Sequence, residues 1–403
     1  MLEKYADENK LPIMDQQTFE TVTNDLGKEK FREMLAQYIA DVRPKFPLKQ
    51  ISADIMRQCF KSLQKQDVWE FVKPIELLEK NVKEKYDDYK YNFKDHGLGI
   101  IDAPSIFNDL SNYFHQHLRL NCSSYGFKAP IDVWNNGDAK DVWRCLGPIW
   151  RGINTERHLR EGTYMSAFRL GTYIATQFKP VVAKTIYDMT KANTVLDTSC
   201  GWGDRLAGFF ASNATEYYGC DPNPNTYKQY MKQIEEYSKF FPNKKVKIYN
   251  CGAENLPYDE LPDIDCAFTS PPYFSTERYN EGGEKEENQS WFKFDEYSKW
   301  RDDFYIPVSH QSYTRSKHTF INIMDPTIKG KRYYSSDELV DSLKANFVGQ
   351  IGMRIMQRPK SDKLFESEEE KAEFMNRIYI ENIWCFSQEK LDYFRHSRRA
   401  TLF

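Results

Sequence analysis

Residues 269–274, TSPPYF, place a hydroxyl, two prolines and an aromatic ring in direct succession. A proline fixes its own φ and has no N–H, so the Pro271 carbonyl is held rigidly with no donor on Pro272 to compete for it. The Ser270 hydroxyl and this carbonyl can accept the two hydrogens of an amine attached to an aromatic ring. The nitrogen lone pair would then be directed toward an electrophile. Tyr273 adds a ring face for stacking, worth about 1–3 kcal/mol per base when nucleic-acid bases are bound.

A second candidate site lies in 195-VLDTSCGWGDRLAGFF-210. Asp197 ends a predicted strand, and Gly201 and Gly203 form a tight turn before a predicted helix. Glycines let the backbone approach a ligand closely, and a helix N-terminus favours electronegative groups. The next predicted strand ends at Asp221, close to the distance of about 20 residues at which an acid reaches the ribose hydroxyls of a bound nucleotide. The pattern therefore predicts a nucleotide-containing cofactor.

From about residue 165 onward strands alternate with helices, which is typical of a mostly parallel sheet covered on both faces. The prediction is an α/β, Rossmann-like sheet of seven strands whose last two strands form a hairpin. The strands are expected at 194–197, 217–221, 246–251, 264–270, 319–324, 349–356 and 380–387. The helices are expected at 168–191, 203–213, 224–240, 294–315 and 336–346. The charged stretch 361–374 is predicted to be a solvated loop or a short helix.

Residues 1–160 are predicted to form a mostly helical N-terminal domain, and residues 161–403 the domain that carries both candidate sites. Segments 17–41 and 52–73 place apolar residues three and four apart, with Ser52 as an N-cap. No chemical motif lies in this part, so we expect a scaffold, a surface for a protein partner or a substrate-recognition region. The tryptophans of 133–153 are expected to pack in a core, with a substrate groove as the alternative.

The composition limits the classes of protein to which this chain can belong. The formal net charge is −3 and the pI about 6.2, so contacts to nucleic acid must come from local basic patches. The eight cysteines include no CxxC pair, which predicts a reduced, intracellular chain without a metal site. The charged N-terminus MLEKYADENK does not resemble a signal peptide, and no apolar run approaches the ~20 residues needed to span a bilayer. We therefore expect a soluble protein of the cytoplasm, or of wherever its substrate resides.

Taken in order, the motifs resemble the class I S-adenosylmethionine-dependent methyltransferases. The resemblance rests on Asp-x-x-x-Gly-x-Gly at 197–203, the strand-end Asp221, the turn 251-CGAENLPYDE-260 and the Ser-Pro-Pro-Tyr sequence at 270–273. It covers about residues 165–390 and is closest to the enzymes that methylate exocyclic amines of DNA bases. In that family an Asp or Asn often replaces Ser270. The serine form leaves adenine N6 and cytosine N4 both open as targets.

The resemblance implies a binding site for S-adenosylmethionine and no metal. The helix predicted at 168–191 is similar to the motif that covers the methionine end of this cofactor. The third strand's turn lacks the acid that often holds the adenine amine, so adenine would be read by the Ala253 backbone or by Glu254. The cofactor-binding residues implied are Gln177, Phe178, Lys179, Asp197, Ser199, Gly201, Trp202, Gly203, Asp221, Pro222, Ala253 and Glu254.

The resemblance also implies roles at the proline sequence. Ser270 and the Pro271 carbonyl would polarise the amine, and Tyr273 would stack on the base, with Pro272 completing the catalytic group. Substrate contacts are expected from Phe274 and, at phosphates, from cations of the basic clusters. No cysteine follows a proline, which disfavours the covalent route to cytosine C5. The cations chosen for substrate contact are Lys331, Arg332 and Arg358.

Two alternatives remain open. The same chemistry could act on a base in RNA in place of DNA. A chain of another class, a nucleic-acid-binding or assembly subunit that keeps the fold without turnover, would agree with the large helical part and the missing adenine-side acid. Cofactor binding would separate that second alternative from an enzyme.

Overall fold

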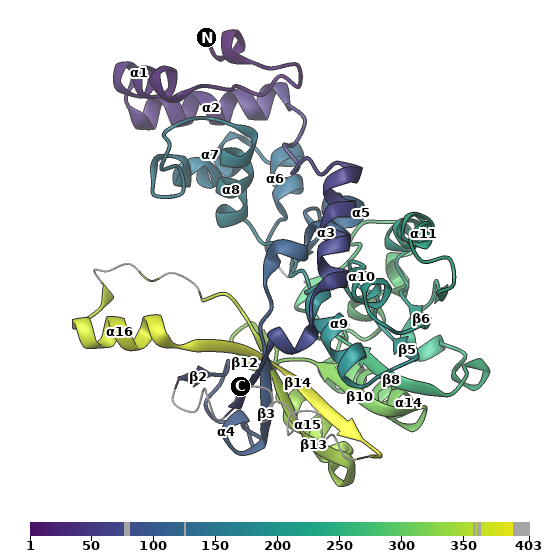
Figure 1. Ribbon diagram of the computed structural model, residues 1–403. Coiled ribbons are helices and arrows are strands. Elements are labelled where there is room, and N and C mark those ends of the chain that lie inside the picture. Colours follow the sequence, from purple (N-terminus) through teal and green to yellow (C-terminus); the bar gives the residue numbers. More distant parts are fainter. Residues whose placement is uncertain (76–80, 125, 358–359, 361–363, 390–403) are drawn as a thin grey trace. The chain divides into compact units, whose positions relative to one another are not determined.

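The computed structural model describes residues 1–75, 81–124, 126–357, 360 and 364–389, which group into two compact units (Figure 1). The helical unit contains residues 1–52, 115–176 and 277–281. The sheet unit contains the described residues of 53–114, 177–276 and 282–403. Each unit is therefore assembled from several stretches of chain. Compactness does not establish independent folding, so a two-domain boundary near residue 160 stays a prediction.

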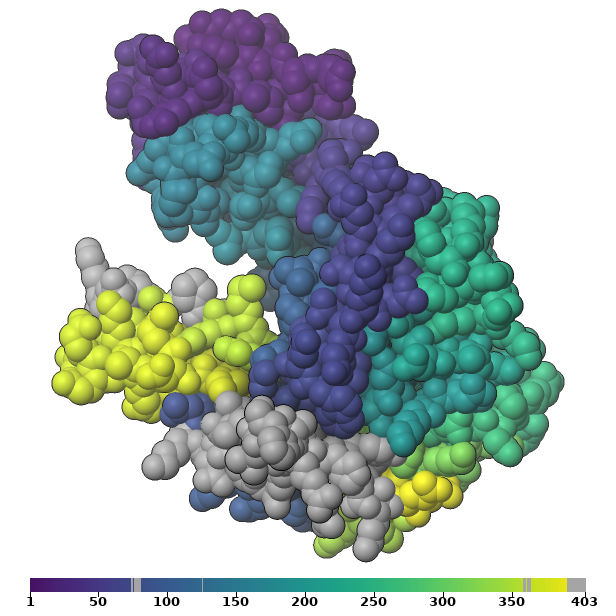
Figure 2. All heavy atoms as spheres, viewed as in Figure 1, coloured from purple at the N-terminus to yellow at the C-terminus, as the bar shows by residue number. Residues whose placement is uncertain are grey.

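The helical unit is built by α1 (Gln16–Leu26), α2 (Lys28–Val42), α6 (Pro130–Asn136), α7 (Ala139–Leu146) and α8 (Glu161–Gly171). Gly27 separates α1 from α2 because its φ of +76° cannot continue a helix, so the single helix predicted over 17–41 is two helices. Figure 2 shows the purple N-terminal residues against the teal segment that follows residue 115, and α2 packs on α7.

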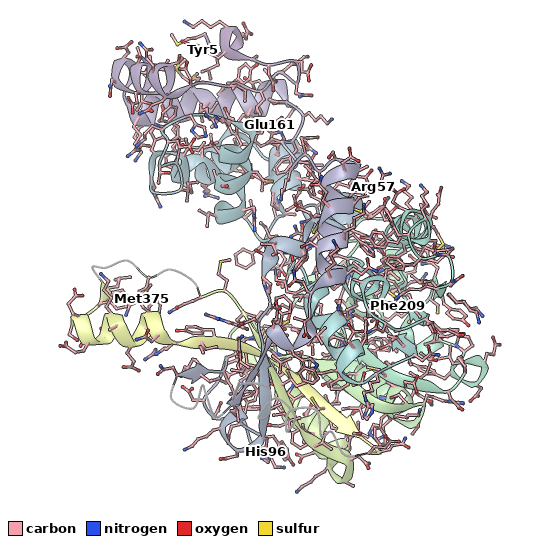
Figure 3. All side chains as sticks on the ribbon, viewed as in Figure 1. Tyr5, Arg57, His96, Glu161, Phe209 and Met375 are labelled. Carbon is pink, nitrogen blue, oxygen red and sulfur yellow. The ribbon has the colours of Figure 1, made fainter. Side chains whose placement is uncertain are left out.

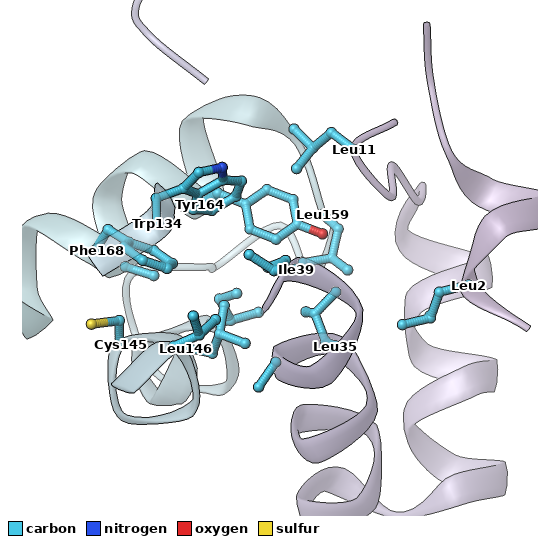
Figure 4. Close-up of a cluster of buried hydrophobic side chains, with 14 of the residues drawn as sticks. Leu2, Leu11, Leu35, Ile39, Trp134, Cys145, Leu146, Leu159, Tyr164 and Phe168 are labelled. Atoms are coloured by element: carbon cyan, nitrogen blue, oxygen red, sulfur yellow. The ribbon is translucent and has the colours of Figure 1, made fainter. Parts of the chain in front are cut away.

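An aromatic core holds the helical unit together. Figure 4 shows Leu35 and Ile39 of α2 near Trp134, Tyr164 and Phe168. Trp134 is fully buried, and its ring centroid lies 4.8 Å from that of Phe168 and 5.9 Å from that of Tyr164. Its indole N–H donates to a backbone carbonyl at 2.7 Å, which satisfies its polar atom. Core packing, the role predicted for this tryptophan, is confirmed.

The sheet unit carries one ten-stranded sheet in the order β1-β3-β13-β14-β10-β8-β5-β6-β7, with β2 paired to β14. All seven predicted strands are present, within three residues of their expected ends. They are β5 (Thr194–Asp197), β6 (Glu216–Cys220), β7 (Lys245–Tyr249), β8 (Ile264–Thr269), β10 (Ser316–Asn322), β13 (Phe347–Arg354) and β14 (Ile378–Ser387).

The pairing of these seven strands gives the sheet its direction. The pairs from β10 through β8, β5 and β6 to β7 are parallel, whereas β14 runs antiparallel between β10 and β13. The predicted hairpin of the last two strands is therefore confirmed. Among these seven strands, β14 is the one that runs antiparallel to its neighbours, and it lies second from the β13 end. This arrangement is the one expected of a class I methyltransferase fold, and the predicted α/β class is confirmed.

Three further strands come from the segment predicted to be mostly helical. They are β1 (Val72–Pro74), β2 (Val82–Lys83) and β3 (Gly97–Ile101). Strand β3 pairs parallel to β13, and its Ile100 and Ile101 are almost completely buried. The apolar run 97-GLGII-101, bounded by glycine, is typical of a short buried strand and could have been recognised.

Three helices of the sheet unit follow the predicted ranges: α10 (Asp204–Ala211), α11 (Pro224–Ser238) and α15 (Ser335–Ser342). Helix α9 (Pro180–Met189) is the exception. The single helix predicted over 168–191 is wrong, since α8 ends at Gly171 and a new helix begins at Pro180. A proline excludes the residue before it from helical geometry, and Lys179 is accordingly extended at φ −113° and ψ 115°.

The helix predicted over 294–315 is interrupted in a different way. It consists of α13 (Tyr297–Lys299), a π-helical turn at Trp300–Tyr305 and α14 (Ile306–Thr314). Pro307 lacks the N–H that would continue the preceding α-helical pattern, which accounts for the wider turn.

The charged insertion contains α16 (Glu368–Asn376), so the short-helix alternative is confirmed there, and 361–363 lie outside the described residues. Figures 1 and 3 show α16 at the end of the β13–β14 hairpin, with Met375 exposed.

Among the described residues, no helix combines the length and apolarity needed to cross a membrane. The remaining helices and short strands are α3 (Ala53–Lys65), α4 (Phe93–His96), α5 (Asp109–Arg119), α12 (Ser290–Lys293), β4 (Ser123–Ser124), β9 (Glu277–Arg278), β11 (Thr327–Ile328) and β12 (Lys331–Arg332).

Candidate active site

Two turns leave neighbouring strands at the same edge of the sheet. The glycine turn follows β5, the proline turn follows β8, and β5 pairs parallel with β8 through Val195–Cys266 and Leu196–Ala267. The carboxyl ends of parallel strands share one edge, which is where ligands bind in open α/β sheets. The two chemical motifs predicted from the sequence are therefore brought together.

The glycine turn has the backbone shape that its sequence predicts. Gly201 and Gly203 adopt φ values of +58° and +72°, in the left-handed region that favours glycine. Gly203 directly precedes α10, so the turn delivers the chain to a helix N-terminus. Ser199 and Gly201 are partly exposed, whereas Trp202 is buried.

Asp197 supports this turn from within the protein. Its side chain is fully buried, and its Oδ2 lies 2.9 Å from Arg205 Nε and accepts the Tyr217 hydroxyl at 2.7 Å. Its Oδ1 accepts the Ser199 N–H at 3.1 Å. The carboxylate is thus used inside the fold. This corrects the predicted direct contact with the cofactor: Asp197 shapes the turn that would make the contact.

Asp221, directly after β6, connects the glycine turn to α11. Its Oδ1 accepts the Asn223 N–H at 2.9 Å and the Thr226 hydroxyl at 3.1 Å, and its Oδ2 accepts the Tyr230 hydroxyl at 3.0 Å. The Gly201 N–H also donates to this carboxylate. Loss of solvation raises the pKa of Asp221 to about 6 in spite of these donors, although the residue keeps some exposed surface.

The hydroxyls around Asp221 have other acceptors. The Thr226 hydroxyl lies 3.0 Å from the Asn223 carbonyl, and the Tyr230 hydroxyl also reaches the Gly201 carbonyl. Either hydroxyl can therefore release the carboxylate to an incoming donor without losing its own hydrogen bond. The released carboxylate can then accept hydrogen bonds from the hydroxyl groups of a ribose.

The turn after β7 places Ala253 and Glu254 in a short 3₁₀ turn. Ala253 is buried, and Glu254 Oε1 lies 2.6 Å from Lys293 Nζ. The Glu254 carboxylate thus has a cationic partner already, which favours backbone atoms over this side chain for contact with an adenine. Pro222, after Asp221, keeps part of its surface exposed.

The three residues before α9 have different surroundings. The Gln177 amide donates to the Asn108 carbonyl at 3.0 Å, to Ser111 Oγ at 2.8 Å and to Asp204 Oδ1 at 3.1 Å. The amide hydrogens are therefore used within the protein, and contact of this side chain with a cofactor stays a prediction.

Phe178 and Lys179, the two residues that follow Gln177, are partly exposed to solvent. The Phe178 ring lies 5.5 Å from the Phe268 ring, and the Arg205 guanidinium sits 5.1 Å from its centre. Lys179 forms the N-terminal boundary of α9. Contact of these two residues with a cofactor stays a prediction.

The proline turn begins directly after β8. Pro271 is buried, whereas Ser270, Pro272 and Tyr273 are partly exposed. The Tyr273 hydroxyl donates to Glu381 Oε1 at 2.6 Å, and Ser270 Oγ lies 3.5 Å from the same hydroxyl. The turn thus keeps accessible the hydroxyl and the ring to which the sequence assigns chemistry.

Glu381 was not predicted, although it lies in the site. It is on β14, it is only 7% exposed, and burial raises its pKa. A charged residue inside the mostly apolar strand 380–386, IENIWCF, is the sequence signal that could have identified it.

Phe274 does not face a substrate, so that prediction is wrong. It is 5% exposed, and its ring is enclosed by Tyr297 at 5.6 Å, Trp300 at 6.0 Å and Tyr333 at 5.6 Å between ring centroids. Its positive φ of 52° turns the chain so that the ring enters this cluster. Phe274 anchors the proline turn in the core.

The predicted phosphate-binding cations have different environments. Arg332 Nε lies 2.8 Å from Oδ2 of the buried Asp325, and its guanidinium also pairs with Asp88. This corrects its predicted role, because its charge is used within the fold. Lys331 is exposed, with its amino group 4.9 Å from the centre of the Tyr333 ring. Arg358 lies outside the described residues.

Comparison with known proteins gives distant structural likenesses. No protein family model matches the sequence, and no curated protein matches it. The N-terminal domain of EvdMO1, crystallised in the presence of SAH and D-fucose, is 10% identical, with a TM-score of 0.31, over 52% of this chain and 82% of its own. A putative RNA methyltransferase from Pyrococcus horikoshii is 11% identical, with a TM-score of 0.27, over 52% and 81%. The delta-N METTL16 MTase domain is 13% identical, with a TM-score of 0.30, over 49% and 74%. These likenesses are too remote to assign an activity.

Proposed function

We propose that this chain is an S-adenosylmethionine-dependent methyltransferase that methylates an exocyclic base amine, adenine N6 or cytosine N4, in DNA. The observation that carries the proposal is the pairing of β5 with β8, which sets a glycine turn and a Ser-Pro-Pro-Tyr turn side by side at one sheet edge. One turn has the shape of a cofactor site. The other has the groups that hold an amine.

The residues around the glycine turn fit this cofactor. The left-handed Gly201 and Gly203 would let it approach the backbone, Asp221 would accept the ribose hydroxyls, and the backbone at Ala253 would face the adenine. When bound, the cofactor supplies a methyl group made electrophilic by a sulfonium. Ser199, Trp202 and Pro222 belong to the same turns and complete the proposed binding surface.

The proline turn would bind and orient the nucleophile. Ser270 Oγ and the Pro271 carbonyl accept the two amine hydrogens, which withdraws the nitrogen lone pair from the ring and fixes its direction. The ring of Tyr273 offers a stacking face for a base taken out of the duplex. These contacts raise the rate by holding the amine in a reactive geometry, and they require no metal.

DNA is the favoured polymer because the Ser-Pro-Pro-Tyr sequence resembles that of the DNA amino-methyltransferases. Exposed cations such as Lys331 would contact phosphates. An RNA base is the second candidate, because the contacts to an amine are the same in either polymer. The helical unit, which has a core of its own, offers a surface for a protein partner or for substrate.

The test is methyl incorporation from labelled S-adenosylmethionine into duplex DNA, single-stranded DNA and RNA, followed by mass spectrometry of the nucleosides. Labelled N6-methyladenine or N4-methylcytosine from DNA supports the proposal. A labelled RNA base would move the substrate to the second candidate. Cofactor binding without transfer to any of the three polymers would contradict the proposal, and no cofactor binding at all would support the inactive-subunit alternative.

A further inference from the structure

Glu381 lies beside the proline turn although it belongs to none of the sequence motifs. Strand β14 runs antiparallel to β10, and Asn322, the last residue of β10, pairs with Ile383, so Glu381 lies at the edge of the sheet where β10 ends. Its side chain is buried, and its Oε1 accepts the Tyr273 hydroxyl at 2.6 Å. Burying a carboxylate costs free energy, so a buried acid at this edge calls for a function.

The hydrogen bond to Glu381 fixes where the Tyr273 hydrogen points. The hydroxyl has one hydrogen, and the acceptors in its reach include these three: Glu381 Oε1 at 2.6 Å, the Asn322 carbonyl at 3.2 Å and Asn322 Oδ1 at 3.4 Å. An ionised carboxylate only accepts, and the short, charge-assisted bond is the strongest of the three. The hydrogen therefore points at Glu381, and the phenolic oxygen keeps its lone pairs for other donors.

Ser270 is the next group in this chain of hydrogen bonds. Its Oγ donates toward the Tyr273 oxygen over 3.5 Å, a long contact of the kind that shortens when a substrate closes the site. Once the Ser270 hydrogen is committed to Tyr273, both lone pairs of Ser270 Oγ face other partners. A serine held this way accepts hydrogen bonds from the substrate and does not donate to it.

We propose that Glu381 is a positioning residue that orients the chain Ser270→Tyr273→Glu381 and so makes Ser270 an acceptor for an N–H group of the substrate. The inference rests on the proposed function and extends it, because it explains how a serine selects an amine over a ring carbonyl oxygen. A ring carbonyl needs a hydrogen-bond donor, which the oriented Ser270 does not provide.

The orientation depends on the charge of Glu381, which is set by its neighbours. The groups that face it are Tyr273 from the turn, Asn322 from β10 and the ammonium of Lys85. Burial raises the pKa of Glu381, and these three groups oppose the rise without cancelling it. Below that pKa the carboxyl gains a proton that it can donate to Tyr273, and the chain can reverse. We expect turnover to increase as Glu381 ionises, with a midpoint above the usual range for glutamate.

Glu381→Gln tests the orientation, because an amide of the same size donates as well as accepts. We expect kcat to fall about 10- to 100-fold, the value of a hydrogen bond to a charged group, and the acidic limb of the pH profile to disappear. Tyr273→Phe, which keeps the ring, should produce the same two changes. The double variant should be no slower than the slower single variant, because both substitutions break the same chain of hydrogen bonds.

Glu84→Gln is the matched control. Glu84 is a second partly buried glutamate of the sheet unit, and it accepts from Asn382, the residue after Glu381 on β14, at 2.7 Å. This variant should keep turnover and the acidic limb. A wild-type pH profile in Glu381→Gln, or losses that multiply in the double variant, would overturn the proposal. If Glu381→Gln does not fold, Tyr273→Phe tests the same chain of hydrogen bonds, because it removes the hydroxyl in the middle of that chain.

Infrared titration of the chain without cofactor or substrate gives an independent readout. Wild-type protein should show a protonated-carboxyl band that titrates above the usual glutamate range. Asp221 and Glu84 also have raised pKa values, so the diagnostic signal is the difference between the wild-type and Glu381→Gln titrations, which isolates the Glu381 band. The Glu381 band should be shifted in Tyr273→Phe and retained in Glu84→Gln. If wild-type protein methylates no nucleic acid, the proposed function fails while this titration still tests the chain of hydrogen bonds. A carboxyl spectrum unchanged by Glu381→Gln would overturn it.

Discussion

Arg205 forms a buried ion pair with Asp197, with Nε 2.9 Å from Oδ2 and both side chains at most 4% exposed. The two residues bracket the glycine turn, since Asp197 precedes it and Arg205 lies in the first turn of α10. Arg205 also donates to the Ser199 carbonyl within the turn. The shape of the proposed cofactor site therefore depends on a charge pair buried beneath the turn.

Arg205→Ala should destabilise the protein by about 3–5 kcal/mol, because it leaves the Asp197 carboxylate buried without its cation. Urea unfolding followed by circular dichroism measures the change. Lys299→Ala, which breaks the exposed pair with Asp295, is the control and should leave the unfolding midpoint unchanged. Equal unfolding midpoints for the two variants would show that the buried pair stabilises the fold no more than the exposed pair does.

Cofactor affinity should increase as the pH rises through about 6, because Asp221, whose pKa burial raises to about 6, accepts ribose hydroxyls best when ionised. For one linked proton, affinity should fall about fivefold from pH 6 to pH 5, and calorimetry can follow it. Asp221→Asn should weaken binding and remove the pH dependence. Asp259→Asn, at an exposed acid, should retain both, and a flat profile in wild-type protein would contradict the assignment.

The same raised pKa predicts an opposite trend for stability. Asp221 holds its proton more tightly in the folded chain than in the unfolded chain, where its pKa is near 3.8. The folded state therefore binds more protons between about pH 4 and pH 6, and the contribution of Asp221 to stability decreases as the pH rises through that window. Comparing Asp221→Asn with wild-type protein in urea at pH 4 and pH 6 isolates this term, since the variant should lack it.

Ser270→Ala and Tyr273→Ala should each lower turnover about 10- to 100-fold and leave cofactor affinity nearly intact. The reason is that in the proposed site both side chains would contact the base, whereas the cofactor would be held by the glycine turn and Asp221. Single-turnover assays with labelled cofactor, together with a binding titration, separate the two quantities. Ser275→Ala, in the same loop, is the control. Wild-type rates in both catalytic variants would refute the assigned roles.

Lys331 and Arg332 are adjacent, yet their variants should differ. Lys331→Ala should weaken DNA binding and reduce its salt slope by about 1, with unchanged stability, because its ammonium is exposed. Arg332→Ala should instead destabilise the fold, because it leaves the buried Asp325 without its cation. Filter binding at several salt concentrations and thermal unfolding measure both effects. A reduced salt slope without destabilisation in Arg332→Ala would restore it as a phosphate contact.

Deleting residues 1–160 should yield an insoluble chain even though both chemical motifs remain. The deletion removes β1 and β3 from the sheet and exposes the edge of β13, including the face on which Ile100 is packed. Expression and gel filtration of the truncated chain test this expectation. A soluble, monomeric product that binds cofactor would show that residues 161–403 form a domain of their own.

The strands of the α/β part were predictable because most of them are short, rich in apolar residues and bounded by turn residues. Strand β5 matches its predicted ends, and the prediction for β8 runs one residue past its end at Thr269. Local sequence decides such ends, since a buried strand needs a continuous apolar run. The helix across 168–191 failed because apolar spacing outweighed the break that Pro180 requires.

The roles of side chains were harder to predict, because a residue type does not tell which way it faces. Asp197 and Arg332 carry charges suited to ligands, yet both pair with charged partners inside the fold, Arg205 and Asp325. Glu381 was overlooked for the same reason, since its partner Tyr273 is more than 100 residues away. The sequence motifs identify the turns that carry the candidate site. The side-chain pairs that support these turns depend on tertiary structure.

The position of β3 in the sheet has a consequence for synthesis on the ribosome. Ile100 pairs with Gly352, so the apolar strand Gly97–Ile101 is made about 250 residues before the strand that covers its edge. Pairings between such distant segments form slowly and leave apolar edges open to misassembly. The nascent chain must keep this strand from aggregating until β13, at Phe347–Arg354, has been synthesised.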